Sequence, residues 1–297
     1  MNIVEKAAEK LKALRPEQQV SARIAPMSEA VSPPPAPTVE RLQERSQTVE
    51  QPPEAVAQYH VDQTVLKRMG YLPANHDGDD RLRDELRRIK RPLLANVTGK
   101  SAKAPDHAQR IMVTSARPGE GKTFTALNLA LSLAREPDFE VLLVDGDIPK
   151  SSLTRAFGLD GRPGLMDVLD NDKRHPESVI VRTDVPNLQV VPVGTRHPLT
   201  AELFGSRRMK DVLEEFGGRN PRRLMIFDSS PLLATSESPV LASYMGQVVV
   251  VVAASQTRQQ ALDAALESLN DSQYVGLILN MSQLPASESY YDSGYGY

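Results

Sequence analysis

The chain has 297 residues, 40% of them hydrophobic, which is enough for one substantial buried core with further segments outside it. It contains no cysteine, so disulfides, thiolate catalysis and zinc–thiolate sites are excluded. The formal net charge of −3 gives no electrostatic signature of nucleic-acid binding, and the five histidines lack metal-ligand spacing.

The first 90 residues carry weak helical signals separated by low-complexity sequence. Apolar residues at helical spacing predict a short amphipathic helix over residues 1–15. Residues 16–78 are predicted to be a mostly disordered, proline-rich linker, with a short helix and turn possible after residue 56. A charged helix is expected over residues 79–90. The longest apolar run, residues 248–254, is too short for the about 20 residues that span a membrane, so we expect a cytoplasmic protein.

Beyond residue 110 the chain alternates between strand and helix signals. Strands are predicted at 110–115, 140–145, 187–193, 223–228, 247–253 and 275–280, and helices at 122–135, 200–216 and 258–270. Several strands are continuous Val, Ile and Leu runs, which is typical of strands covered on both faces. The predicted fold class is therefore α/β, with a doubly wound, mostly parallel sheet flanked by helices. The domain is expected to span residues 79–281.

A phosphate-binding loop is predicted directly after the first strand. Gly121-Lys122-Thr123 matches the end of the pattern G-x-x-x-x-G-K-[ST], with Ala116 in place of the first glycine. Gly119 and Gly121 let backbone N–H groups close around phosphate oxygens, as do the first donors of the following helix. Lys122 would reach the β- and γ-phosphates of ATP, and Thr123 would bind Mg²⁺. The predicted nucleotide-binding residues are Ala116, Arg117, Pro118, Gly119, Glu120, Gly121, Lys122, Thr123 and Phe124.

Three aspartates lie at the carboxyl ends of two further hydrophobic strands. Asp145 and Asp147 end one strand, and Asp228 ends the other in a Walker-B-like sequence. Because parallel strands share one carboxyl edge, these side chains should meet the phosphate loop there. We assign Mg²⁺ to Thr123, Asp145 and Asp228, and general-base catalysis to Asp147, although Asp145 could exchange roles with it. The predicted catalytic residues are Lys122, Asp145, Asp147 and Asp228.

The last eight residues contain four of the eight tyrosines of the chain, namely Tyr290, Tyr291, Tyr295 and Tyr297. Residues 282–297 lack apolar periodicity, so these rings have no core to enter and the segment reads as a flexible tail. Extended from residue 280, the tail reaches roughly 55–60 Å. Together with the nucleotide site, the cluster indicates an enzyme that phosphorylates its own tyrosines.

The combination of these motifs resembles the bacterial tyrosine kinases of capsular and exopolysaccharide assembly, closest to the exosortase-associated tyrosine autokinase branch. The phosphate loop, the D-x-D strand end, the Walker B aspartate and the tyrosine cluster all occur here, over residues 79–297. Glu85, Arg88 and Arg91 resemble the E-x-x-R-x-x-R element that packs against the neighbouring subunit in that family. One departure is Pro149, followed by Lys150, where the family pattern D-x-D-x-R has arginine.

The resemblance implies an ATP- and Mg²⁺-dependent protein-tyrosine autokinase that phosphorylates its tail in trans within a ring-shaped homo-oligomer. It also implies regulation of exopolysaccharide synthesis or export, and activation by a separate transmembrane polysaccharide co-polymerase that recruits the chain to the inner membrane face. The chief alternative is a ParA/MinD-like ATPase without kinase activity, in which Arg117 would stand near the position of a functional lysine. A scaffold that binds nucleotide without turnover is a third class. The tyrosine-rich ending favours the kinase.

Overall fold

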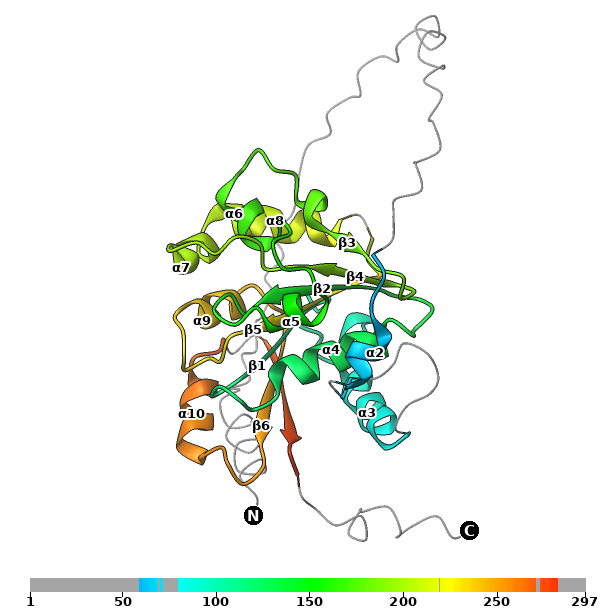
Figure 1. Cartoon of the computed structure of the whole chain (residues 1–297). Coiled ribbons are helices and arrows are strands. Elements are labelled where there is room, and N and C mark those ends of the chain that lie inside the picture. The colour runs from blue at the N-terminus through cyan, green and yellow to red at the C-terminus, as the bar shows by residue number, and fades with distance from the viewer. Residues whose placement is uncertain (1–58, 69, 72–79, 219, 271–272, 283–297) are drawn as a thin grey trace, which may run out of the picture.

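The computed structural model describes residues 59–68, 70–71, 80–218, 220–270 and 273–282, which fold around one seven-stranded sheet (Figure 1). The strands that compose the sheet are β1 (Arg110–Ser115), β2 (Glu140–Gly146), β3 (Val181–Arg182), β4 (Leu188–Val191), β5 (Arg223–Ser229), β6 (Gln247–Ala253) and β7 (Tyr274–Asn280). Their order is β3-β4-β2-β5-β1-β6-β7, and every neighbouring pair is parallel except β3 with β4. The predicted fold class is confirmed.

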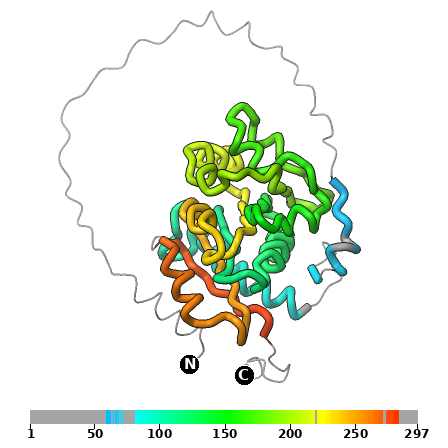
Figure 2. Tube along the Cα trace, turned by 60° about the vertical axis from the view of Figure 1, so that its left-hand side comes forward, coloured from blue at the N-terminus to red at the C-terminus, as the bar shows by residue number. Residues whose placement is uncertain are grey.

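Helices cover both faces of the sheet. Those described are α2 (Gln63–Arg68), α3 (Asp80–Val97), α4 (Lys122–Leu133), α5 (Ser152–Ala156), α6 (Leu165–Asp170), α7 (Thr200–Phe204), α8 (Arg207–Gly217), α9 (Glu237–Ala242) and α10 (Gln259–Glu267), with a short 3₁₀ helix, η2 (Pro176–Val179). Side chains alternate along each strand, so Ile111 and Val113 join the core under α2 to α5, whereas Met112 joins the core under α6 to α10. Figure 2 shows the segment of α6 to α8 at one end of the molecule and α10 with β7 at the other.

The strand order brings the three sequence motifs together. β5 lies between β2 and β1, and Asp145 on β2 stands directly beside Asp228 on β5 in the register. Val113 on β1 pairs with Asp228 on its other side, two residues before β1 ends. Because these strands are parallel, the phosphate loop and both aspartates lie at the same carboxyl edge of the sheet.

Most predicted strands and helices occur within a few residues of their expected bounds, with one clear exception. The helix predicted over residues 200–216 is two helices, α7 and α8, separated at Gly205 and Ser206. Ser206 caps α8 by accepting a hydrogen bond from the Met209 N–H, at 3.3 Å, and a capping serine starts a new helix at its own position. The charged helix predicted over 79–90 extends to Val97 and contains Pro92.

The segment before α3 is partly packed on the domain. Tyr59 bridges to Thr183, the Val61 N–H donates to Oδ1 of Asp184 at 2.9 Å, and Leu66 is fully buried. Residues 59–68 and 70–71 therefore belong to the packed structure, although they fall within the predicted 16–78 linker. The predicted boundary at residue 79, the helix over 1–15 and the tyrosine tail over 282–297 stay predictions, because residues 1–58, 72–79 and 283–297 lie outside the described residues.

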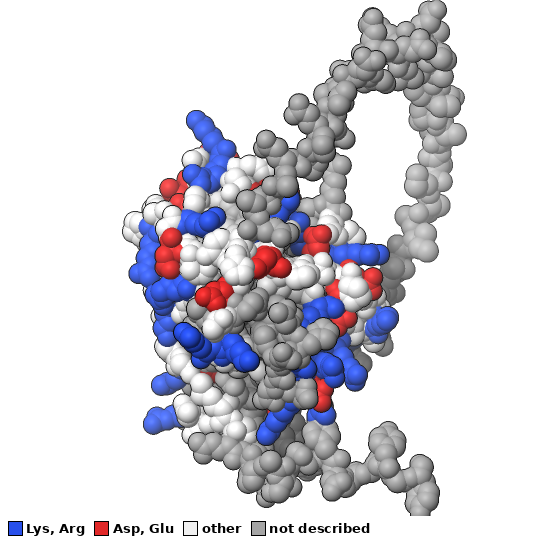
Figure 3. Space-filling view, turned by 45° about the vertical axis from the view of Figure 1, so that its right-hand side comes forward, with Lys and Arg blue, Asp and Glu red and all other residues white. Residues whose placement is uncertain are grey.

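The surface carries both signs of charge. On the face seen in Figure 3, Lys and Arg side chains are interspersed with Asp and Glu side chains rather than gathered at opposite poles. This agrees with the nearly balanced composition of 35 basic and 38 acidic residues. Within the described part of the chain, no helix has the length and apolar content that crossing a membrane requires.

Candidate functional site

The loop between β1 and α4 is a preformed phosphate-binding turn. Gly119 and Gly121 have φ angles of 87° and 95°, in the left-handed region that glycine adopts without strain. A Cβ atom on Gly121 would lie 2.1 Å from Nδ2 of Asn280, so this position also requires glycine for space. Asn280, at the end of β7, donates from that amide to the carbonyl oxygen of Glu120 at 3.0 Å.

The carboxylate of Glu120 stabilises the shape of the loop, because both of its oxygens accept hydrogen bonds from the protein. Its Oε2 accepts a hydrogen bond from the Arg117 N–H at 2.8 Å, and its Oε1 accepts one from the hydroxyl of Thr257. The hydroxyl of Ser115 donates to the Arg117 carbonyl at 2.8 Å. Glu120 is only 4% exposed. Its predicted contact with nucleotide would therefore involve its backbone, and its carboxylate holds the shape of the loop.

Lys122 and Asp147 form a buried ion pair at the centre of the site. Nζ of Lys122 donates to Oδ2 of Asp147 at 2.5 Å, and the two side chains are 6% and 2% exposed. The hydroxyl of Ser230 donates to the other carboxylate oxygen of Asp147 at 2.8 Å. The lysine of the phosphate loop and the proposed general base are thus in direct contact, with the base held from two sides.

Asp145 is engaged in the local structure through both carboxylate oxygens. Oδ1 accepts a hydrogen bond from the Asp147 N–H at 3.2 Å, and Oδ2 accepts two from the backbone and hydroxyl of Thr154, at 2.8 and 2.7 Å. Burial raises the pKa of Asp145 to about 6, although these hydrogen bonds lower it. Asp145 connects the end of β2 to α5 and orients the backbone of Asp147.

Asp228 is the contrasting case, because it is fully buried and lacks such partners. Neither of its carboxylate oxygens accepts a hydrogen bond of ordinary geometry from a described residue. Burial raises the pKa of Asp228 to about 8; nearby Lys122 and Thr123 lower it, whereas the other two aspartates raise it further. A buried carboxylate without donors is stabilised by a cation or by a proton.

The site fits a magnesium ion held mainly by water and phosphate oxygens. Among the residues described, no group of three or more His, Cys, Asp or Glu side chains could hold a metal ion. Mg²⁺ usually binds through one or two protein oxygens and keeps several waters, so the unpartnered carboxylate of Asp228 is a suitable contact. Asp145 would first have to release hydrogen bonds. The assignment of Thr123, Asp145 and Asp228 to the metal stays a prediction.

The remaining predicted residues occupy distinct surroundings. Ala116 is fully buried, and Arg117, Pro118 and Gly119 are exposed at the mouth of the loop. The ring of Phe124 stacks on that of Tyr71, with centroids 5.7 Å apart. On α3 the exposed side chains include Glu85, Arg88 and Arg91. The four predicted phosphoacceptor tyrosines lie outside the described residues.

Sequence reasoning missed Ser230, Thr154, Thr257 and Asn280, which hold the aspartates and the loop. Ser230 follows Asp228 by two residues and could have been suspected from that proximity. The other three come from α5, the segment after β6, and the end of β7. No local pattern marks them, because their contacts depend on which strands are neighbours.

The fold and the loop define a P-loop nucleotide-binding domain. In agreement, the family profile described as "AAA domain" matches residues 108–274. Among curated proteins, the chain is 33% identical over 182 residues to the tyrosine-protein kinase YwqD of Bacillus subtilis, covering 61% of this chain and 75% of YwqD. It is 32% identical over 172 residues to the tyrosine-protein kinase Ptk of Acinetobacter johnsonii, covering 57% of this chain but only 23% of Ptk.

A solved structure gives the same result. The kinase domain of VpsO is 30% identical, with a TM-score of 0.53, and the match covers 67% of this chain and 98% of that domain. The chain therefore belongs to the bacterial tyrosine-protein kinases. The predicted family and enzyme class are confirmed at this level.

Proposed function

We propose that this chain is an ATP-dependent protein-tyrosine autokinase whose substrates are its own C-terminal tyrosines Tyr290, Tyr291, Tyr295 and Tyr297. The observation that carries the proposal is the contact between the phosphate-loop lysine, Lys122, and a buried carboxylate, Asp147, at the sheet edge where β7 ends. The tail follows β7 directly in the sequence, so the segment that carries the acceptor tyrosines starts from that edge.

Asp147 would be the general base. A tyrosine hydroxyl has a pKa near 10, so only about 0.1% is ionised at pH 7, and a carboxylate that accepts its proton assists attack. The phenolic oxygen would form a bond to the γ-phosphorus of ATP as the bond to the β-phosphate bridging oxygen breaks. The proton would pass to Asp147, and ADP would leave.

The ion pair with Lys122 suggests how the base becomes available. While Nζ of Lys122 contacts Oδ2 of Asp147, that oxygen cannot accept a phenolic proton. The phosphates of a nucleotide would compete for the lysine, and Ser230 would still hold the other oxygen of Asp147 in place. ATP binding would thus separate the pair and free the base.

Mg²⁺ would neutralise the charge of the phosphates when it is bound. Asp228 and Thr123 would hold it, because the carboxylate of Asp228 is buried without hydrogen-bond partners. Asp145 would act as a positioning residue, since its two oxygens bind the backbone of Asp147 and Thr154.

Arg196 would supply the guanidinium that is missing at position 149. Its Nη2 donates to the carbonyl oxygen of Pro149 at 2.8 Å, beside a cavity of about 400 Å³ that Ile148 and Pro149 also line. We expect Arg196→Gln to slow tyrosine phosphorylation more than Lys150→Gln, the matched loss of a neighbouring charge. Equal rates in both variants would remove Arg196 from this role.

The proposed assembly is a ring-shaped homo-oligomer in which the tail of one protomer enters the site of the next. The helix α3 packs on its own domain through Leu86 and Leu93, which are buried. Its opposite side is therefore available to a neighbouring protomer, and the exposed residues there include Glu85, Arg88 and Arg91. A separate transmembrane polysaccharide co-polymerase would activate the ring and recruit it to the inner membrane face. The cycle would regulate exopolysaccharide synthesis or export.

One assay tests the proposal against its rivals. Purified full-length chain is incubated with Mg-ATP, with and without the cytoplasmic part of a candidate activator, and phosphotyrosine and released phosphate are both measured. A kinase gives phosphotyrosine that depends on Lys122. Phosphate release without phosphotyrosine in both arms would indicate a ParA/MinD-like ATPase, and neither product would indicate a nucleotide-binding scaffold.

A further inference from the structure

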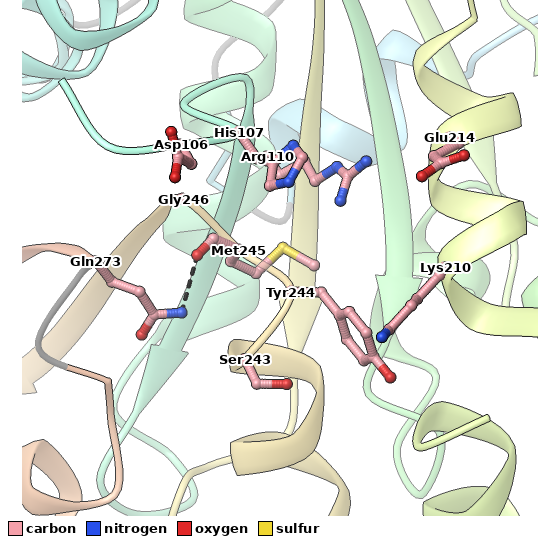
Figure 4. A pocket seen from close by; sticks show the side chains of 10 residues that line it. All are labelled: Asp106, His107, Arg110, Lys210, Glu214, Ser243, Tyr244, Met245, Gly246 and Gln273. Atoms are coloured by element: carbon pink, nitrogen blue, oxygen red, sulfur yellow. Dashed lines mark hydrogen bonds between the residues drawn. The ribbon is translucent and has the colours of Figure 1, made fainter. Parts of the chain in front are cut away.

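A second cavity, of about 320 Å³, lies at the end of the sheet opposite the phosphate loop (Figure 4). Its lining includes Arg110 at the start of β1, Lys210 and Glu214 on α8, and Tyr244 and Met245 in the turn before β6. β1 runs from this cavity to the phosphate loop, and at about 3.3 Å per residue its length separates the two by roughly 17 Å. The cavity is therefore distinct from the phosphoryl-transfer site.

The backbone around the cavity is tightly fixed. The Gly246 N–H donates to the carbonyl oxygen of Arg110 at 3.1 Å, and a Cβ atom on Gly246 would lie 2.4 Å from the carbonyl oxygen of Asp106. The side-chain amide of Gln273 donates to the carbonyl oxygen of Met245 at 2.8 Å. These contacts hold the turn before β6 against the segment before β1, so the cavity is preformed.

Arg110 is a buried cation whose Nε has no acceptor among the described residues. It is 7% exposed, and the opposite charge that acts on it is the exposed carboxylate of Glu214. Burial lowers the pKa of Arg110, and the charge of Glu214 opposes this effect. Arginine nevertheless stays protonated in proteins, so a buried guanidinium of this kind calls for an anion.

Further donors surround the same space. Figure 4 shows the guanidinium of Arg110 extending toward Glu214 and the amine of Lys210 ending beside the ring of Tyr244. Lys210 is exposed on α8, so its amine can turn toward the cavity, and burial raises the pKa of Tyr244, whose hydroxyl is a neutral donor at pH 7 as in any tyrosine. Glu214 and Asp106 are exposed at the rim, where water screens their charge.

We propose that this cavity binds a small oxyanion, a phosphate or carboxylate group, through Arg110, Lys210 and the hydroxyl of Tyr244. The planar guanidinium presents donors in a fork that matches two oxygens of such a group. Lys210 adds a second positive charge from α8. The site needs neither ATP nor the tyrosine tail, so it stands independently of the proposed kinase function.

The test uses a reporter inside the cavity, because the phosphate loop also binds phosphate. The full chain is labelled with ¹³C-methyl methionine, and the Met245 resonance is assigned with Met245→Leu. Inorganic phosphate and, separately, acetate are titrated at constant ionic strength. A saturable shift of Met245 with either anion supports the site, and the more effective anion identifies the preferred group.

Variants decide whether the named residues bind the anion. Arg110→Gln should abolish the saturable shift, and Lys210→Ala should require about tenfold more anion, the loss expected for one charged hydrogen bond. If Arg110→Gln fails to fold, the variants Lys210→Ala and Tyr244→Phe are titrated in its place, and each should need more anion than the unmodified chain. Arg222→Ala, an exposed arginine paired with Asp138, is the matched control and should bind as the unmodified chain does. No shift of Met245, or equal shifts in all variants, would overturn the proposal.

Discussion

Removing Lys122 should destabilise the folded chain as well as abolish its activity, because Asp147 would be left as a buried charge. The two side chains are 6% and 2% exposed and their charged atoms are 2.5 Å apart. Breaking a buried pair by removing one partner costs about 3–5 kcal/mol. We expect Lys122→Met to lose about 3 kcal/mol in the absence of nucleotide, because Ser230 still donates to Asp147.

The double variant Lys122→Met/Asp147→Asn removes both charges and should lose only about 1 kcal/mol, so the two single losses should not add. At about 2–4 °C per kcal/mol for a domain of this size, Lys122→Met should lower Tm by about 6–12 °C. Circular dichroism during heating, at pH 7 without nucleotide or Mg²⁺, measures this. Arg87→Met breaks an exposed pair and is the control, with an expected loss below about 1 kcal/mol. Additive losses in the cycle would refute the buried-pair reasoning.

Three further results are expected. Burial raises the pKa of Asp228 in the folded chain to about 8, whereas the same carboxyl in the unfolded chain has a pKa of about 4. Between these values the folded chain holds a proton that the unfolded chain has lost, so the stability of the nucleotide-free chain should fall as pH rises from about 4 to about 8. In Asp228→Asn the free energy of unfolding, measured with urea at pH 5 and at pH 8, should differ less between the two pH values than in the unmodified chain. An equal difference in both proteins would contradict this. Gly121→Ala should destabilise more than Gly119→Ala by about 1–3 kcal/mol, since only position 121 meets a neighbouring side chain; equal Tm values would contradict this. Arg88→Ala with Arg91→Ala should convert the proposed ring to monomers, whereas an unchanged mass by light scattering would show that this side of α3 is only a solvated surface.

The strands and the phosphate loop could be predicted because their signals are local. The run from Val248 to Val252 indicates a strand covered on both faces, and Gly121, Lys122 and Thr123 are adjacent in the chain. Asp228 was predicted from its place at a strand end. The lack of hydrogen-bond partners for its carboxylate could not be predicted, because those surroundings depend on β5 lying between β2 and β1.

The supporting contacts depend on residues far apart in the chain. Thr257 is 137 residues from Glu120, and Arg196 is 47 residues from Pro149. In the sequence, the cation adjacent to the position of the family arginine is Lys150. The structure brings Arg196 to the same place from the loop after β4, a contact that no local spacing indicates.

The most direct test of the autokinase is transfer between two distinguishable copies of the chain. The enzyme copy carries Phe at positions 290, 291, 295 and 297, and the isotope-labelled acceptor copy carries Lys122→Met. After incubation with Mg-ATP and the activator, mass spectrometry reads the acceptor tail. The account predicts phosphate on Tyr290, Tyr291, Tyr295 or Tyr297 of the labelled copy. Release of phosphate from ATP with all four acceptor tyrosines unmodified would contradict it.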